Sequence, residues 1–338
     1  MGKKIAAFGE VMMRLQVPGY DLLSQAGTLV YSFSGTGVNV MSALARYGHD
    51  GYLVTRLPDN PLGDAAAANL RKLGVAQKFV VRGGSSIGMY FLENGFGARP
   101  SRVTYAHRLE SSFNTAPDNV YDFAAIAGQL DAAHFCGITL AMNDSVRSQL
   151  LRFAEAVKAR GGIVAFDCNY RPSLWGENGY GKAKPYYEKM LGLADIVMMN
   201  EKDAMHVLGM PAKAATREGQ LEELIPEAAS RYGIAAAAGT HRSVNGDNTH
   251  SLRGYLYKNG AFHYSDLLTF SVYDRIGAGD AYASGILHGE LSGFAPERTV
   301  RYAAAAAMLA HTTTGDTPMA SEREIERAMT QAAGDVER

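Results

Sequence analysis

The sequence is poor in cysteine: its 338 residues contain only Cys136 and Cys168. Each lies in an apolar, strand-like run. Two cysteines cannot supply the dense disulfide framework of a small secreted domain. We interpret both as small core residues of a protein in a reducing compartment, rather than as a disulfide or a metal-binding pair.

Strong charge imbalance and long hydrophobic runs are also missing. The formal net charge is -1, and no basic run or acidic tail stands out, which argues against nucleic acid as the main partner. The longest uncharged stretch, residues 22–45, is interrupted throughout by Ser, Gln, Gly, Thr and Asn, so it is no membrane span. The apolar run at residues 5–9 is too short for a signal peptide. We therefore expect a cytoplasmic protein without a membrane partner.

No internal repeat, coiled-coil heptad or clean linker divides the chain. Strand-like runs at residues 4–9 and 52–57 alternate with helical patterns at 35–47 and 65–73. This order predicts an α/β fold with a doubly wound, mostly parallel sheet flanked by helices. We expect residues 1–338 to form a single domain of this kind.

The alternation is interrupted by strands that have no helices between them. They are expected at residues 10–17, 29–33, 78–81, 87–93 and 102–105. We predict that they form a small β-sheet lid over the open end of the main sheet, inserted at about residues 11–33 and 78–112. The alternative is a peripheral hairpin without a role.

From residue 118 the alternation returns. Strands are expected at 133–138, 163–168, 196–199 and 236–239, a strand pair at 253–257 and 261–264, and helices at 144–160, from 204 and at 300–310.

The segment Asp274–Asp280, which reads DRIGAGD, lies between a strand-like run and a helical pattern at residues 281–291. Gly277 and Gly279 let the backbone turn tightly, and the free N–H groups and positive dipole end of the helix add to an anion site. A bound phosphate would repel Asp280, so this carboxylate suits a general base that takes a proton from an attacking hydroxyl. The alternative is a plain tight turn, because no Walker A Gly-Lys-Ser/Thr follows and a Rossmann fingerprint belongs near the start of a chain.

Polar residues follow three other predicted strands at their carboxyl ends, where doubly wound sheets bind ligands. Arg171 could clamp a phosphate or carboxylate, or form a local ion pair on a surface loop. The segment Asn200–Asp203 could contact Mg²⁺ through water, or serve as an ordinary helix cap. Residues 239–242 form a small-residue loop that could hold nucleotide phosphates.

Four segments in this order and spacing resemble the ribokinase-like sugar kinases, also called the phosphofructokinase B family. They read SGTGVN, DCNYRPSLW, NEKD and DRIGAGD, and the resemblance covers nearly the whole chain. Within the family the sequence looks most like 2-keto-3-deoxygluconate kinases. That closer likeness rests on DCNYRPSLW, on the pair Tyr90 and Tyr105 with Arg108, and on residues 311–316 after an Ala-rich helix.

The resemblance implies roles for individual positions. By this likeness the sugar is contacted by Gly35, Asn39, Tyr90, Tyr105 and Ile138, and the acid sugar and the transferred phosphate are held by Arg108 and Arg171. The anion hole is formed by Gly277, Ala278 and Gly279, and the catalytic base is Asp280. The nucleotide is bound by Thr240, Arg242, Gly277, Gly279, His311 and Gly315. The implied cofactors are ATP and Mg²⁺, with Asn200 and Asp203 reaching the metal through water, and a monovalent cation is left open.

Three departures from the family pattern concern the site. Aligning Tyr105 directly puts His107 where the family has arginine, and we prefer one inserted residue, which restores Arg108. The glycine-rich nucleotide loop is replaced by GTHRSVNGDN. Asp203 stands where the metal motif ends in Glu.

The resemblance implies an ATP-dependent kinase that converts 2-keto-3-deoxygluconate to 2-keto-3-deoxy-6-phosphogluconate. One alternative is a fructokinase or another neutral-sugar kinase. A second is a catalytically silent sugar- or nucleotide-binding protein, which would have no need of Asp280. An NAD-dependent oxidoreductase is disfavoured because no early GxGxxG is followed by an acidic residue. Apolar lid residues, namely Val30, Tyr31 and Phe33, further predict a homodimer joined through the lids.

Overall fold

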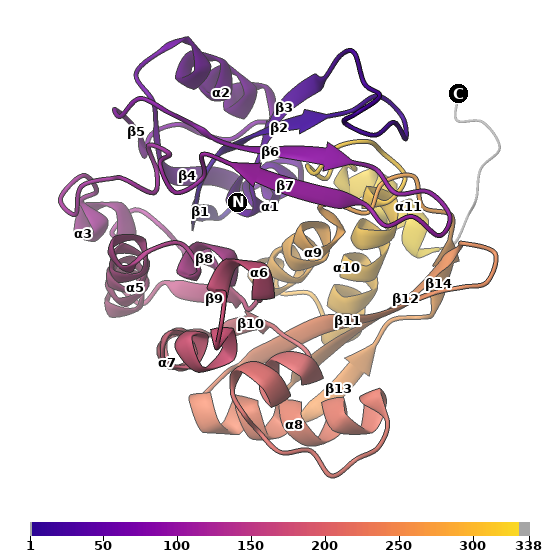
Figure 1. The fold of residues 1–338 in the computed structure, drawn as a ribbon. Coiled ribbons are helices and arrows are strands. Elements are labelled where there is room, and N and C mark those ends of the chain that lie inside the picture. Colours follow the sequence, from indigo (N-terminus) through magenta and orange to yellow (C-terminus); the bar gives the residue numbers. More distant parts are fainter. Residues whose placement is uncertain (1, 331–338) are drawn as a thin grey trace.

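The computed structural model describes residues 2–330 and contains two separate sheets (Figure 1). The strands of the central sheet are β1 (Lys4–Phe8), β4 (Asp50–Leu57), β5 (Val80–Arg82), β8 (Ala132–Cys136), β9 (Ile163–Asp167), β10 (Ile196–Met198), β11 (Ala236–Val244), β12 (His250–Lys258), β13 (Ala261–Tyr264) and β14 (Leu268–Phe270). The strands of the small sheet, called the lid, are β2 (Met12–Gln16), β3 (Val30–Ser34), β6 (Gly88–Glu93) and β7 (Arg102–Ala106).

The helices cover the central sheet. They are α1 (Thr36–Arg46), α2 (Pro61–Lys72), α3 (Phe123–Ala127), α4 (Gly137–Leu140), α5 (Asp144–Ala159), α6 (Pro172–Trp175), α7 (Gly179–Leu191), the π-helical turn η1 (Asp203–Val207), α8 (Arg217–Tyr232), α9 (Ala278–Ser292), α10 (Pro296–Ala310) and α11 (Glu322–Met329). The strand order is β13-β12-β11-β10-β9-β8-β1-β4-β5, with β14 paired to β12. All pairs from β11 to β5 are parallel, and β12 pairs antiparallel with its neighbours.

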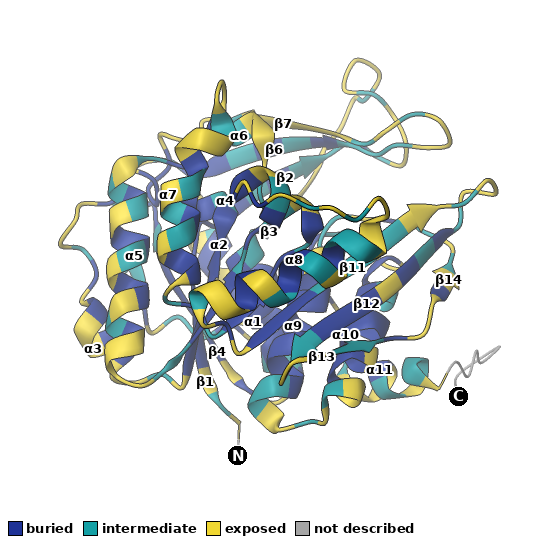
Figure 2. Ribbon diagram, turned by 90° about the horizontal axis from the view of Figure 1, so that it is seen from below, coloured by how far each residue is buried: buried dark blue, intermediate teal, exposed yellow. Residues whose placement is uncertain are grey.

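Both faces of the central sheet are buried, as parallel sheets require. Along β1, Ile5 and Ala7 pack into one core with α1, α2, α9, α10 and α11, whereas Ala6 and Phe8 pack into the other core with α3, α5, α7 and α8. Figure 2 shows the buried strands between helices that expose their outer faces. The ribokinase-like doubly wound fold predicted from the sequence is therefore confirmed.

The lid presents three of its aromatic and charged side chains in register. Arg14 on β2 lies opposite Tyr90 on β6, and Tyr90 lies opposite Tyr105 on β7. Directly opposed residues share one face of a sheet. Arg14, Tyr90 and Tyr105 therefore lie side by side across the lid.

Two sequence expectations were wrong in detail. The strand expected near residues 78–81 is β5, which extends the central sheet beside β4 instead of joining the lid. The helix α2 lies between β4 and β5, so the three form a parallel β-α-β unit. The loop expected at residues 239–242 is strand, because residues 239–244 continue β11 and pair with β12.

A third correction concerns the lid surface. Phe33 was expected to be available to a second copy, but its side chain is only 4% exposed and packs in the core beside α1 and α2. Val30 and Tyr31 on the same strand remain 65% and 59% exposed. Within residues 2–330, no helix is long and apolar enough to cross a membrane.

The position of α9 depends on very close packing against α10. A β-carbon at Gly285 would lie 2.5 Å from the Cα of Ala303, so only hydrogen fits between these two helix backbones. The alanine-rich face of α10 keeps the approach close along this contact. Because α9 begins at the DRIGAGD turn, this contact helps to fix the start of the helix in space.

We predict that Gly285→Ala lowers the free energy of unfolding by about 1–3 kcal/mol, because overpacking outweighs the better helix propensity of alanine. Urea unfolding followed by circular dichroism measures this. The matched control is Gly246→Ala, where a β-carbon meets no atom within 4 Å and a change within about 0.5 kcal/mol is expected. Equal stability of the two variants would contradict the packing argument.

Candidate active site

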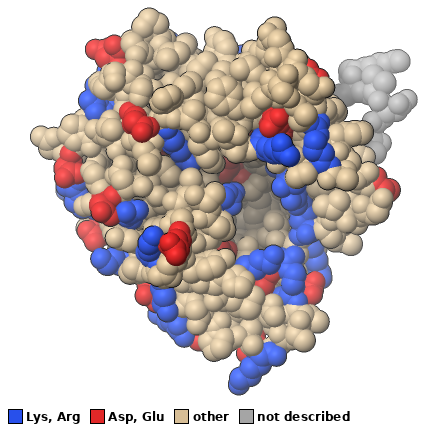
Figure 3. Space-filling model, in the orientation of Figure 1, with Lys and Arg blue, Asp and Glu red and all other residues tan. Residues whose placement is uncertain are grey.

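A cavity of about 730 Å³ lies between the lid and the carboxyl ends of the central strands. Its wall includes Tyr90 and Tyr105 from the lid, Asp167 at the end of β9, and the turn at the start of α9. Figure 3 shows a hollow in this face of the molecule with Lys and Arg side chains along its rim. The basic residues that line the cavity are Arg108, Arg171, Lys202, Arg217, Arg242 and Arg275.

The floor of the cavity is the N-terminus of α9. Gly277 precedes the first turn in a left-handed conformation with φ of 85°. A β-carbon there would lie 1.8 Å from the backbone oxygen of Asp316, so no other residue fits. Ala278 and Gly279 follow in the first turn and also line the cavity. Because these residues have almost no side chain, the free N–H groups of this turn stay accessible to an anion.

Asp280 lies in the same turn and is buried. One of its carboxylate oxygens, Oδ2, accepts a hydrogen bond of 2.7 Å from Nδ2 of Asn39 on α1. Burial raises the pKa of Asp280 to about 6, although Asn39 and the charge of Arg171 both lower it. The carboxylate is thus ionised at neutral pH yet more basic than an exposed aspartate.

Asp167 and Asp203 bring further carboxyl groups to the floor. Loss of water, and then the charge of Asp280, raise the pKa of Asp167 to about 8. Loss of water also raises the pKa of Asp203 to about 6, against a hydrogen bond from the backbone N–H of Asn200. The ionised forms of Asp167 and Asp280 repel each other, so the charge of Asp280 favours the protonated form of Asp167.

The charge of Arg171 lowers the pKa of all three carboxyl groups. Its charge acts on Asp167, Asp203 and Asp280, but within residues 2–330 it forms no ion pair at 4 Å or less. Its Nη1 donates only to the backbone oxygen of Tyr170, at 3.3 Å. The ring of Tyr170 stacks between those of Trp175 and Tyr180, which holds the loop in place. A positioned but unpaired guanidinium is suited to a mobile anion such as a phosphoryl group.

The lid end of the cavity carries Arg108. Its Nε donates to Glu10 Oε2 at 3.0 Å, and its guanidinium lies 4.8 Å from the ring centre of Tyr105. Its Nη1 is buried and has no partner among the described residues. The preceding residue, His107, has a left-handed backbone conformation with φ of 50°. Arg108 lines the cavity, and His107 does not. Arg108 therefore keeps donor capacity for a ligand.

Other expected sugar contacts lie on the same part of the wall. They are Gly35 and Asn39 at the start of α1, Tyr90 in the lid and Ile138 in α4. Burial raises the pKa of Tyr90 to about 12, so its hydroxyl remains a hydrogen-bond donor at all ordinary pH values.

The opposite end of the cavity is lined by Thr240 and Arg242 on β11, Arg275 and His311. Burial and the neighbouring charge of Arg275 lower the pKa of Arg242. Two arginines that repel each other suit the phosphates of a nucleotide. His311 is buried, its Nδ1 lies 2.7 Å from the backbone oxygen of Ala307, and burial lowers its pKa to about 4, so it is a neutral wall residue. Gly315 lies outside the lining and its N–H donates to Asp274 Oδ2 at 3.3 Å.

Several cavity residues were given no role from the sequence. They include Glu10, Arg217, Arg275 and Asp316. Glu10 was detectable, because it comes two residues after the end of β1, where a doubly wound sheet meets its ligand. Arg275 belongs to the DRIGAGD segment and Asp316 to residues 311–316, but only the folded structure shows that both line the cavity.

The residues around Asp203 are compatible with Mg²⁺ held mainly by water and phosphate. Among residues 2–330, no three acidic, histidine or cysteine side chains form a group that could hold a metal by themselves. Mg²⁺ is usually bound by one or two carboxylates together with substrate phosphates. Burial raises the pKa of both Asp167 and Asp203, so a cation bound beside them would stabilise their ionised forms. Asn200 Oδ1 already accepts from the N–H of Lys202, at 2.8 Å.

Comparison with known proteins gives a consistent relationship. The model of the pfkB family carbohydrate kinases matches residues 2–323. A 2-dehydro-3-deoxygalactonokinase of Haloferax volcanii is 29% identical over 332 residues, 97% of each chain. The structure of a 2-dehydro-3-deoxygluconokinase from Thermotoga maritima is 33% identical, with a TM-score of 0.93 over 98% of this chain and 99% of the other. A fructokinase from Xylella fastidiosa with bound ATP, 22% identical with a TM-score of 0.77 over 97% and 99%, shares the fold alone.

Proposed function

Because the chain belongs to the pfkB family of carbohydrate kinases, we propose that it transfers the γ-phosphoryl group of ATP to the terminal hydroxyl of 2-keto-3-deoxygluconate. The product is 2-keto-3-deoxy-6-phosphogluconate. The names of the Thermotoga maritima and Haloferax volcanii relatives both denote kinases of 2-keto-3-deoxy sugar acids. A fructokinase would have the same fold, so the fold does not distinguish a sugar-acid kinase from a neutral-sugar kinase. The residues of the site must decide between the two substrates.

The observation that carries the proposal is that Arg108 and Asp280 line one cavity. A carboxylate placed at the lid would meet the guanidinium of Arg108, whose planar fork matches its geometry. The hydroxyl at the other end of the sugar acid would then lie toward Asp280. A neutral sugar offers Arg108 no anionic partner.

In the proposed reaction, Asp280 accepts the proton of the terminal hydroxyl as the oxygen attacks the γ-phosphorus. The bond from that phosphorus to the bridging oxygen breaks, and ADP leaves. The N–H groups at Gly277, Ala278 and Gly279 and the unpaired Arg171 stabilise the negative charge on the transferred group. Asp203 and Asn200 would hold Mg²⁺ through bound water, and the ion would neutralise charge on the ATP phosphates. Thr240, Arg242 and Arg275 bind the nucleotide.

A coupled ADP-release screen tests this function. The acceptors are 2-keto-3-deoxygluconate, 2-keto-3-deoxygalactonate and fructose, each with and without K⁺. We expect the two sugar acids to be preferred over fructose. A preference for fructose would replace the proposal by the neutral-sugar kinase, and no turnover on any acceptor would favour a silent binding protein.

We predict that Asp280→Asn lowers kcat by a factor on the order of 10²–10⁴ or more with little change in sugar affinity, because size is kept and basicity is lost. In the wild type, kcat/KM should fall as the pH decreases through about 6, since the base works only when ionised. Stopped assays from pH 5 to 8 measure both effects. Near-wild-type turnover of the variant would refute the assignment of Asp280.

For Arg108, we predict that alanine lowers kcat/KM for the sugar acid by roughly ten- to a hundredfold, because a charge-assisted hydrogen bond contributes about 1.5–3 kcal/mol. Fructose should lose far less. The double variant Glu10→Gln/Arg108→Ala avoids leaving Glu10 as an unpaired buried charge. Arg102→Ala, on the exposed strand β7, is the matched lid control. Equal losses for acid and neutral sugar would contradict a carboxylate-binding role.

We also propose a homodimer joined through the lids. Val30 and Tyr31 lie exposed on β3, an edge strand of the lid, and such edges tend to be covered. Tyr31→Asp should therefore give monomers in sedimentation at micromolar concentration, whereas Val244→Lys, at an exposed apolar residue on β11, should leave the dimer intact. A wild type that sediments as a monomer with full activity would disprove the dimer.

A further inference from the structure

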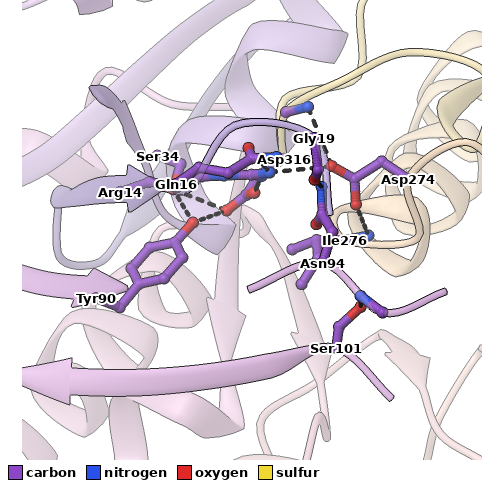
Figure 4. Close-up of polar contacts among 12 residues, drawn as sticks. Arg14, Gln16, Gly19, Ser34, Tyr90, Asn94, Ser101, Asp274, Ile276 and Asp316 are labelled. Carbon is purple, nitrogen blue, oxygen red and sulfur yellow. Dashed lines mark hydrogen bonds and ion pairs between the residues drawn. The ribbon is translucent and has the colours of Figure 1, made fainter. Parts of the chain in front are cut away.

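Arg14 lies on β2 of the lid, yet only 1% of its surface is exposed. Its Nη1 bonds to Asp316 Oδ1, and its Nη2 donates to Asp274 Oδ2 at 3.0 Å. Figure 4 shows the guanidinium reaching from the lid strand toward both carboxylates. Asp274 opens the DRIGAGD turn, and Asp316 lies in the segment after α10. One side chain thus ties the lid to two segments of the main body.

The two carboxylates are held by donors from both sides. Asp316 Oδ2 accepts from the hydroxyls of Ser34, at 2.8 Å, and Tyr90, which both belong to the lid. Asp274 Oδ1 accepts from the N–H of Ile276 at 3.1 Å, inside the turn itself. Arg14 is the cation that forms ion pairs with both acids, so it carries the charge balance of the cluster.

The segment around Asp316 also touches the catalytic turn. The backbone oxygen of Asp316 packs against Gly277, where it leaves no room for a β-carbon. The hydroxyl of Thr317 donates to Asn39 Oδ1 at 3.1 Å, and Asn39 Nδ2 donates to Asp280. A shift of Asp316 would therefore move both the anion hole and the partner of the base.

On the other side, Arg14 lies in register with Tyr90, and Tyr90 with Tyr105, across the lid. Tyr90 and Tyr105 line the lid part of the cavity. A movement of the lid toward a bound sugar would carry Arg14 with it, because both are parts of one hydrogen-bonded sheet.

From these contacts we infer that Arg14 is a positioning residue that couples closure of the lid over the sugar to the geometry of the anion hole. This inference rests on the proposed kinase function, since it assigns the sugar to the lid and the phosphates to the turn. Its consequence is that each substrate increases the affinity for the other. The factor is the same in both directions and typically on the order of 5–150-fold.

The test is calorimetric titration of a nonhydrolysable ATP analogue, with Mg²⁺, in the absence and presence of 2-keto-3-deoxygluconate. The variant is Arg14→Lys, which keeps the positive charge but lacks the fork that spans two carboxylates. Arg102→Lys, the same substitution on the exposed strand β7, is the control. Asp274→Asn repeats the comparison from the other side of the ion pair, in case Arg14→Lys does not fold.

We expect wild type and Arg102→Lys to share one coupling factor, and Arg14→Lys to reduce it by about fivefold or more, with each ligand still bound alone. A merely structural role would lower thermal stability and leave the coupling intact. Wild-type coupling in Arg14→Lys, an equal loss in Arg102→Lys, or no coupling in the wild type would each overturn the inference. A wild type that binds no sugar acid contradicts the proposed function first, and the inference falls with it.

Discussion

A carboxylate that must stay ionised without water constrains everything around it. Asp280 meets this constraint through the N-terminal turn of α9, through the amide of Asn39 and through the charge of Arg171. The same turn must leave space for a phosphoryl group, so it is built from Gly277, Ala278 and Gly279. The close contact of α9 with α10 then holds this turn at one place in the molecule.

In the proposed function, the distribution of charge along the cavity separates the two substrates. At the lid end, Arg108 forms an ion pair with Glu10 and keeps a buried Nη1 without a partner among the described residues. At the opposite end, Arg242 and Arg275 repel each other and attract several negative charges. Arg171 also lines the cavity and forms no ion pair with any residue of 2–330. We therefore propose that a sugar acid with a single carboxylate and a nucleoside triphosphate bind at different ends of this cavity.

The sequence was sufficient for the class of fold and for the small-residue turn at the start of α9, because both depend on local pattern. The β-α alternation predicted the parallel sheet, and DRIGAGD predicted an anion site with Asp280 in the first helical turn. Features that depend on long-range pairing were not accessible. β5 joined the central sheet rather than the lid, and residues 239–244 formed a strand because they pair with β12. Arg14 was given no role from the sequence, since its partners lie 260 and 302 residues away along the chain. Glu10 could have been suspected from its place after β1, whereas the burial of Phe33 follows only from the assembled core.

In the proposed site, one cavity holds a carboxylate at the lid and a terminal hydroxyl at Asp280. The most direct test is the identity of the product, determined by ³¹P and ¹³C NMR after incubation with ATP, Mg²⁺ and 2-keto-3-deoxygluconate. A single phosphate ester on the carbon farthest from an intact carboxylate is the expected product. An ester at another carbon, an acyl phosphate, or an unchanged sugar acid would contradict the proposed site.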